Sequence, residues 1–368
     1  MFFVQITQRF ILCFLFFTLT AICQKSEAAE NSMRQYFRYQ DQADGGEKLG
    51  YLLEGRAYTL GDCLDIDSFL HLLQNEQARA SSIDFDIEQL IVPIPQPRQQ
   101  IAVALNYEDH QSESHLSKMV FFPKLTKLTT WNTPVVHYGA GRSLLDYEVE
   151  WGFLLSRDID SEEVKKITED NIINYVAGVF LILDMTSREM QVRYGSLFDS
   201  YRGFAASKSL PSYAPVGQFF LRYSDFLKLN LKKNDEFAIA LQVNGEQRQG
   251  AKLSEIKHMP AELIKMAFER KIMKKKFIMP DGSKVQAFSG KLFKGDIFIT
   301  GTPAGMRFVA PTSKTKLRAL RYGLSIGRPI SGARDYIVNH QPEHLNSGDE
   351  IFATGTLLGE IIVPIISQ

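Results

Sequence analysis

Short apolar runs bounded by glycine, proline or aspartate recur along the chain from about residue 100 to its end. Runs of this length separated by turn residues are typical of β-strands, whereas a regular βαβ alternation would place longer helical patterns between them. We therefore predict a mainly β fold with additional helices, of the α+β class. The runs are IAVALNY (101–107), DYEVEWGFLL (146–155), YVAGVFLILD (175–184), GQFFLRY (217–223), FAIALQVNG (237–245), GDIFITGTPAG (295–305) and GDEIFATGTLLGEIIVPI (348–365).

Three segments carry the apolar spacing of amphipathic helices, and we predict a helix over each. The first is DIDSFLHLLQNEQAR (65–79), with Asp65 or Asp67 as its N-cap. The other two are SEEVKKITEDNIINY (161–175) and PAELIKMAFERKIM (260–273).

The part of the chain before residue 99 forms a unit of its own in this pattern. It contains the strand-like KLGYLLEGRAYTL (48–60) and the first helix, and it ends in IVPIPQPRQQ (91–100). The three prolines of that last segment favour an extended connector. We expect a small N-terminal region at 29–98, followed by the main domain at 99–368.

Residues 1–28 have the composition of a secretory signal peptide. Arg9 precedes an apolar stretch that is too short to span a bilayer comfortably. Ser26 and Ala28 supply the small residues expected before a cleavage site at Ala29. We expect export to the periplasm or the medium, with an uncleaved membrane anchor as the alternative.

The overall charge does not favour binding to a polyanion. Lys and Arg together number 42, as do Asp and Glu, so no net field attracts nucleic acid. We expect no nucleic-acid partner. Membrane contact is expected only through an uncleaved signal peptide or the basic run at 274–276, which is better explained as a solvated edge.

Two glutamates in DYEVE (146–150) are the first candidate site. In a strand Glu148 and Glu150 point to the same side, and adjacent carboxylates are costly unless water or a cation screens them. A divalent ion such as Mg²⁺ prefers oxygen ligands, and Asp184, at the end of an apolar run, is a third candidate ligand. The alternatives are a solvated strand face for the glutamates and a turn or helix cap for Asp184.

Six motifs occur in order in the second part of the chain: LNYEDHQSE (105–113), DYEVE (146–150), LDMTSREMQ (183–191), SKSLPSYAPVG (207–217), VNGEQRQ (243–249) and GDIFITGTPAG (295–305). Together they resemble the fumarylacetoacetate hydrolase family, from about Ile101 to the C-terminus. The resemblance implies that family's mixed β-sandwich roll and a homodimer. It also implies that Glu148, Glu150 and Asp184 bind Mg²⁺ or Mn²⁺.

The resemblance assigns roles to further residues. It implies that His110 acts as a general base toward water and that Glu113, one helical turn further on, orients it. Lys208 would contact the substrate and stabilise a developing enolate. The substrate pocket would also be lined by Arg188, Gln191 and Thr302.

Without the resemblance these residues have plainer explanations, which the sequence leaves open. His110 and Glu113 would form a surface pair, and Lys208 would be a solvated lysine. Arg188 would form a salt bridge with a ligand carboxylate, and Thr302 would belong to a Gly-Pro turn between strands.

The leading hypothesis from the sequence is a divalent-metal-dependent hydrolase. It would cleave a C–C bond in a 1,3-dicarbonyl acid of the acylpyruvate or fumarylacetoacetate type, through a metal-held enolate and an activated water. The first alternative is a decarboxylase or keto–enol isomerase that acts on a 2-oxo acid with the same site. The second is a secreted binding protein without catalytic activity.

The chain departs from the family pattern in several places. Pro123 and Lys124 stand in the opposite order to a Lys-Pro pair common in the family, which puts the usual contact with the substrate carboxylate in doubt. Two segments look inserted, at about 270–294, with a hairpin around PDGS (280–283), and at 307–345. We expect the second insertion to cover the pocket or an oligomer surface.

Overall fold

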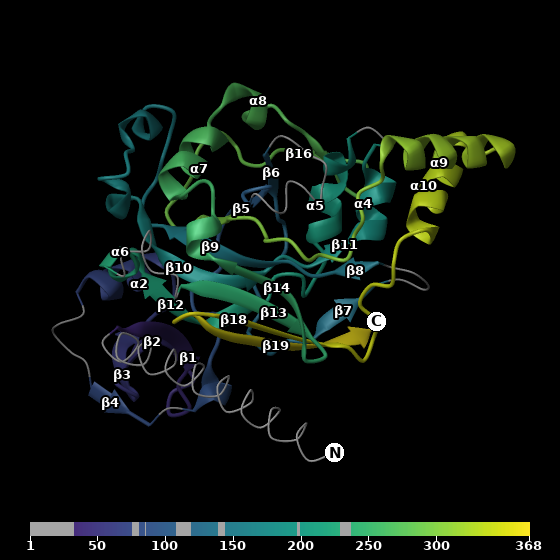
Figure 1. Ribbon diagram of the computed structural model, residues 1–368. Helices are drawn as coiled ribbons and strands as arrows, with labels where there is room; N and C mark the ends of the chain where they lie inside the picture. Colours follow the sequence, from purple (N-terminus) through teal and green to yellow (C-terminus); the bar gives the residue numbers. More distant parts are fainter. Residues whose placement is uncertain are drawn as a thin grey trace, which may run out of the picture.

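A long, mostly antiparallel sheet forms the centre of the molecule (Figure 1). In this computed structural model the described residues are 33–75, 81–84, 86–107, 119–138, 144–196, 199–228 and 237–368. The main sheet has the strand order β4-β3-β2-β1-β12-β10-β9-β17-β5-β6, with β17 and β5 parallel. The strands are β1 (Gln35–Gln40), β2 (Glu47–Leu53), β3 (Arg56–Asp62), β4 (Ser81–Ile83), β5 (Gln100–Ala104), β6 (Val120–Pro123), β9 (Val149–Leu155), β10 (Val176–Leu183), β12 (Val216–Arg222) and β17 (Ile297–Ile299).

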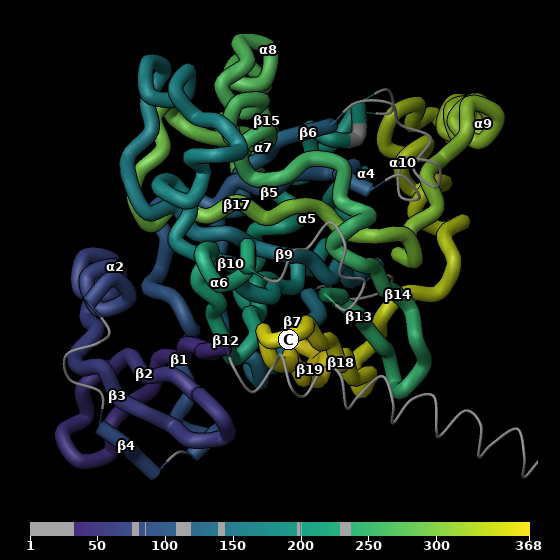
Figure 2. The backbone as a smooth tube through the Cα atoms, turned by 60° about the vertical axis from the view of Figure 1, so that its left-hand side comes forward, coloured from purple at the N-terminus to yellow at the C-terminus, as the bar shows by residue number. Residues whose placement is uncertain are grey.

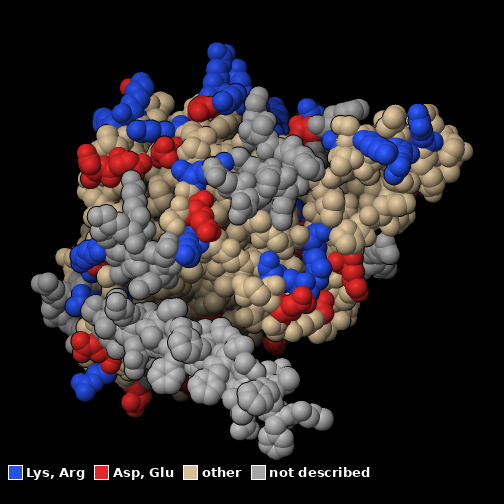
Figure 3. All heavy atoms as spheres, viewed as in Figure 1, with Lys and Arg blue, Asp and Glu red and all other residues tan. Residues whose placement is uncertain are grey.

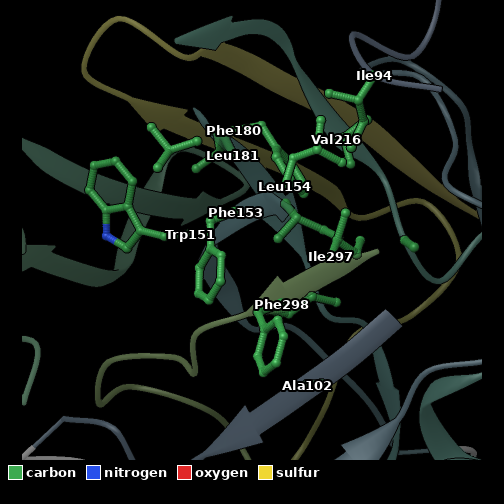
Figure 4. Close-up of a cluster of buried hydrophobic side chains, with 14 of the residues drawn as sticks. Ile94, Ala102, Trp151, Phe153, Leu154, Phe180, Leu181, Val216, Ile297 and Phe298 are labelled. Atoms are coloured by element: carbon green, nitrogen blue, oxygen red, sulfur yellow. The ribbon is translucent and has the colours of Figure 1, made fainter. Parts of the chain in front are cut away.

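A second sheet packs against the middle of the main sheet, where β13 contacts β9 and β19 contacts β10 and β12. The two sheets approach each other closely at Gly217, where there is no room for a side chain. A Cβ atom on this residue would lie 2.6 Å from the carbonyl oxygen of Leu358. Figure 4 shows part of the core, in which the rings of Phe153 and Phe298 stack at 5.0 Å. The second sheet has the order β14 (Glu246–Lys252), β13 (Ala238–Val243), β18 (Glu350–Gly355), β19 (Gly359–Ser367) and β7 (Val135–His137).

Helices lie mainly above the main sheet, on the side away from the second sheet (Figure 1). This arrangement of packed sheets with helices on one side confirms the predicted α+β class and the β-sandwich roll. Two short ribbons, β8 (Leu145–Asp146) with β11 (Thr186–Ser187) and β15 (Phe277–Ile278) with β16 (Lys284–Val285), complete the strands. The α-helices are α2 (Ile66–Gln74), α4 (Arg188–Tyr194), α5 (Phe204–Lys208), α6 (Tyr223–Lys228), α7 (Pro260–Ala267), α8 (Arg270–Met273), α9 (Ser313–Ser325) and α10 (Pro329–Asn339).

The first predicted helix is present as α2. Asp65 is its N-cap, and the Asp65 carboxylate and the Ser68 hydroxyl satisfy each other's backbone N–H groups as a capping box. The third predicted helix is present in two pieces, α7 and α8, because Glu269 has an extended conformation between them.

The second predicted helix, at 161–175, is wrong. The structure has two single 3₁₀ turns there, η3 (Glu163–Lys166) and η4 (Ile172–Asn174). The Asp160 carboxylate accepts hydrogen bonds from the N–H groups of Glu162 and Glu163, and the Asn171 side chain bonds two more backbone groups. Such side-chain bonds to the backbone compete with a continuous helix.

The strands of the N-terminal region continue the main sheet, since β1 pairs with β12 through Tyr36 and Phe220. Figure 2 places β1–β4 at the opposite end of the molecule from α9 and α10. The domain division at residue 98 stays a prediction. The signal peptide predicted at 1–28 lies outside the described residues. Within the described part of the chain, no helix combines the length and apolar character needed to cross a bilayer.

Both segments that look inserted form structure of their own. The hairpin expected around 280–283 is present as β15 and β16. In the segment at 307–345, α9 and α10 pack against each other, and α10 also contacts α4. A small apolar cluster that includes Val192, Ala319 and Ile337 joins these three helices.

Candidate active site

Three buried carboxylates meet where β9 and β10 pair. The two strands are antiparallel with Leu183 opposite Val149, and the Asp184 N–H donates to the Glu148 carbonyl at 2.8 Å. This register brings Asp184 beside Glu148 and Glu150, and oxygens of the three side chains lie within 4.8 Å of one another. The sequence alternative of a solvated strand face is therefore wrong.

Glu150 is almost fully buried in this cluster and has little compensation for its charge. Burial raises its pKa well above the ordinary range, and the carboxylates of Asp184 and Glu148 raise it further. The N–H of Gly301 donates to Glu150 Oε2 at 2.5 Å. Gly301 has a φ of 95°, which side chains other than glycine rarely adopt, so this donor depends on a glycine.

Lys208, the last residue of α5, lies inside the cluster. Its Nζ donates to Glu148 Oε2 at 2.5 Å, to Asp184 Oδ2 at 2.8 Å and to Thr186 Oγ1 at 2.8 Å. Burial alone would lower the pKa of Lys208, but the carboxylates of Asp184 and Glu148 outweigh it and hold the pKa above its usual value. Lys208 is therefore a buried ammonium group and not a solvated surface lysine.

Arg188 connects the cluster to the start of α4. Its Nη2 donates to Glu148 Oε1 at 2.5 Å, its Nε to Asp146 Oδ2 at 2.9 Å and its Nη1 to Gln191 Oε1 at 2.9 Å. The salt bridge that the sequence left open is thus present. Gln191 also lines the pocket, where its amide is oriented by Arg188.

Asp146 was not predicted as a site residue. It is fully buried beneath Arg188 and accepts hydrogen bonds from the N–H groups of Arg307 and Phe308. Burial alone would raise the pKa of Asp146, but Arg188 and His344 outweigh it and keep that pKa below its usual value. A sequence signal existed, because Asp146 stands two residues before Glu148 in DYEVE.

Lys124 also supports the cluster from a position that the sequence left in doubt. It is buried, and its Nζ donates to Asp184 Oδ1 at 2.5 Å and to the Lys208 carbonyl at 2.8 Å. Burial lowers its pKa, and the positive charge of Lys208 adds to that effect. Among the described residues around the pocket, Lys124 is not part of the lining. It therefore holds Asp184 in place.

Thr302 and Gln249 tie the second sheet to the site. The Thr302 hydroxyl donates to the Val149 carbonyl at 3.2 Å and accepts from Gln249 Nε2 at 2.9 Å. Gln249, in β14, also accepts the Val149 N–H at 3.0 Å. Sequence reasoning missed Gln249, although it ends the motif VNGEQRQ.

A pocket of about 140 Å³ opens above these groups. Its floor is polar, whereas its remaining walls are mostly apolar and come from β5, β6, α4, α5 and the segment at 307–345. The predicted residues Glu148, Glu150, Lys208, Arg188, Gln191 and Thr302 all line it, and Asp184 lies behind Lys208. The predicted catalytic pair, His110 and Glu113, lies outside the described residues.

Comparison with known proteins identifies the family of this chain. The family profile described as "Fumarylacetoacetate (FAA) hydrolase C-terminal" matches residues 99–366. The chain belongs to the fumarylacetoacetate hydrolase family. An uncharacterized protein of Staphylococcus aureus (strain USA300) is 27% identical over 251 residues, which cover 66% of this chain and 72% of that relative.

Solved structures of low sequence identity share the fold of this family member. A fumarylacetoacetate hydrolase from the psychrophilic Exiguobacterium antarcticum superposes with a TM-score of 0.59 at 20% identity, covering 91% of this chain and 100% of that one. A maleylpyruvate hydrolase from Sphingobium sp. SYK-6 gives a TM-score of 0.56 at 19% identity, with 91% and 100% covered. A probable 2-hydroxyhepta-2,4-diene-1,7-dioate isomerase from Mycobacterium abscessus gives 0.56 at 21%, with 92% and 99% covered.

The donor set fits a divalent cation. Oxygen ligands on opposite sides of Mg²⁺ lie about 4.2 Å apart, close to the 4.8 Å limit within which the three carboxylates already lie. Four carboxylates face three basic side chains, so the cluster is formally short of positive charge. The carboxylates are those of Asp146, Glu148, Glu150 and Asp184, and the basic side chains are those of Lys124, Arg188 and Lys208.

Proposed function

We propose that this protein is a divalent-metal-dependent hydrolase that cleaves a C–C bond in a 1,3-dicarbonyl acid of the acylpyruvate or fumarylacetoacetate type. The observation that carries the proposal is the buried cluster of Glu148, Glu150 and Asp184 with the Lys208 ammonium group at the floor of a pocket. Family membership and the structural likeness to two hydrolases of such acids support it.

The side chains of the floor would divide the work between binding and charge stabilisation. A Mg²⁺ or Mn²⁺ ion held by Glu148, Glu150 and Asp184 would act as a Lewis acid toward a substrate carbonyl. Lys208 stays protonated beside its carboxylates. By exchanging its bond to Thr186 Oγ1 for one to the substrate, it would donate a hydrogen bond to the oxygen on which negative charge develops. Arg188 fixes the orientation of the Glu148 carboxylate through its bond to Glu148 Oε1.

Hydrolysis also needs a base toward water, and we propose His110 for this role with Glu113 to orient it. His110 would take a proton from water while the hydroxyl oxygen bonds to the carbonyl carbon distal to the acid end. The bond between that carbon and the neighbouring methylene carbon then breaks. The electron pair stays on the methylene carbon as an enolate, which Lys208 would stabilise until it is protonated.

Product analysis tests this proposal. The protein would be incubated with Mg²⁺ and an acylpyruvate, and the products identified by mass spectrometry. The proposal predicts pyruvate and the carboxylic acid of the acyl group, both lost when the metal is removed by a chelator and regained when Mg²⁺ is added back. An unchanged acylpyruvate under all three conditions would contradict it.

A second candidate is a decarboxylase or keto–enol isomerase that acts on a 2-oxo acid at the same site. The feature that favours it is that Lys208 and the carboxylate cluster would stabilise an enolate however that enolate forms. The structural likeness to a probable 2-hydroxyhepta-2,4-diene-1,7-dioate isomerase also supports it. Loss of CO₂ from oxaloacetate, or a shift in ultraviolet absorbance without any cleavage product, would identify this alternative.

Export and dimer formation are further proposals. We propose that residues 1–28 are removed as a signal peptide during export, which N-terminal sequencing of the protein from its native host would check. We also propose a homodimer, which light scattering of the purified protein would check.

A further inference from the structure

The pocket has a second charged feature, far along the chain from the family motifs. The segment at 307–345 supplies one wall of the pocket. Lys316 of α9 is the charged residue in this wall. In Figure 1 α9 and α10 stand beside α4, the helix that begins with Arg188.

Lys316 differs from the other basic residues of its helix. Lys314, Arg318 and Arg321 are exposed, and Figure 3 shows basic side chains on the outer surface where α9 lies. Lys316 is half-buried and precedes the buried Ala319 by three residues, so both lie on the inner face of the helix. The Lys316 ammonium group therefore faces the pocket side of α9.

The other two basic residues that line the pocket are already engaged with carboxylates. Arg188 is paired with Asp146 and Glu148, and Lys208 with Glu148 and Asp184. Lys316 forms no ion pair or side-chain hydrogen bond with any residue of the described ranges. Of the basic residues in the described part of the pocket lining, Lys316 is therefore the one whose charge is available to a ligand.

The surroundings of Lys316 suit an anion at the end of an apolar chain. Apart from Lys316, Arg188 and Gln191, the pocket lining contributed by α4 and the segment at 307–345 is apolar, so it would shield the charge pair from water and strengthen it. These apolar lining residues are Val192, Phe308, Ala310, Pro311 and Ile337.

We propose that Lys316 forms a binding site for a second carboxylate of the substrate. The 2-oxo acid end would meet the carboxylate cluster at the floor, and a carboxylate at the other end of the chain would pair with Lys316. This inference rests on the proposed function and narrows it to diacids. It assigns to the segment at 307–345 a role in choosing the substrate.

Two matched substrates test this site. The first is 2,4-dioxoheptanedioate, which ends in a second carboxylate, and the other is 2,4-dioxoheptanoate, which has a methyl group in that place. Hydrolysis of the first with one water gives pyruvate and succinate, and of the second pyruvate and butyrate. The ratio of kcat/KM for the diacid to kcat/KM for the monoacid measures the contribution of the second carboxylate.

The variants are K316Q, K316E and the control K314Q, which removes an exposed lysine two residues away. Wild type should prefer the diacid, and K316Q should reduce the ratio about fivefold to tenfold, through KM rather than kcat, as expected for a partly exposed charge pair. K316E should reduce it further, and K314Q should leave it unchanged. High salt should also weaken the preference.

A ratio in K316Q equal to that of wild type would overturn the inference, and so would an equal fall in K314Q, which would indicate a general field effect. If wild type cleaves neither substrate, the proposed hydrolysis fails and the anion site is judged by binding alone. Calorimetry with Mg²⁺ present would then compare the two acids. Tighter binding of the diacid that disappears in K316Q would support the site, and equal binding of both acids would overturn it.

Discussion

The floor and the helical wall of the pocket differ in how their charged groups are partnered. On the floor every described basic side chain is paired with a carboxylate, as Lys208 is with Glu148 and Asp184. On the wall from 307–345, Lys316 has no such partner in the described ranges, and large apolar side chains such as Leu317 and Leu324 are exposed on the same helix. The paired charges of the floor hold the catalytic groups in place. Substitutions on the wall should change substrate preference with little loss of stability.

Of the substitutions that test this difference between floor and wall, we expect the largest effect at Lys208. In K208M two buried carboxylates lose a hydrogen-bonded cation, which we expect to lower the free energy of unfolding by about 3–5 kcal/mol. The rate kcat should fall about 100-fold or more, because a donor to the developing oxyanion is removed. Denaturant unfolding and product formation, both measured at a temperature where the variant is folded, check these values.

The matched control for this variant is K228M. Lys228 pairs with Asp225 at 2.7 Å, but its side chain is 67% exposed, so its loss should cost no more than about 1 kcal/mol. K208M should still bind the metal, because its three candidate ligands remain. Stability and kcat like those of K228M would show that the floor is not a coupled charge cluster.

The smallest effect is expected on the helical wall. Leu324 is 65% exposed at the outer side of α9, so L324S should change the free energy of unfolding by no more than about 0.5 kcal/mol. Thermal unfolding and the ratio of diacid to monoacid cleavage should both match wild type. A large loss of stability would mean that this side of α9 is buried in an assembly, which light scattering of wild type would reveal.

The motifs predicted most of the floor, because they carry its chemistry on consecutive or alternate residues. Glu148 and Glu150 alternate on one strand, and Arg188 and Gln191 are one helical turn apart. Two supporting residues were not assigned this role, because long-range pairing brings them in. Lys124 reaches Asp184 from 60 residues away, and Gln249 reaches Val149 from 100 residues away.

The helices were predicted less completely than the strands. Local patterns identified α2 by its N-cap, but α4 and α5 are short, and each overlaps a motif that was interpreted for its chemistry. The helix predicted at 161–175 was wrong because Asp160 and Asn171 bond nearby backbone groups instead. The fold class was predicted from the apolar runs, and these runs form strands in the structure.

A calorimetric titration of Mg²⁺ and Mn²⁺ into wild type and E150Q, with exposed E246Q as the control, tests whether the carboxylate cluster binds metal. We expect both ions to bind to wild type and to E246Q. Metal binding to E150Q should be about 100-fold weaker or more, since loss of a group that only supports a metal ligand already weakens binding about 10- to 100-fold. Turnover by E150Q should be lost. An E150Q protein that binds metal and cleaves the acylpyruvate like wild type would contradict the assignment of this cluster as the metal site.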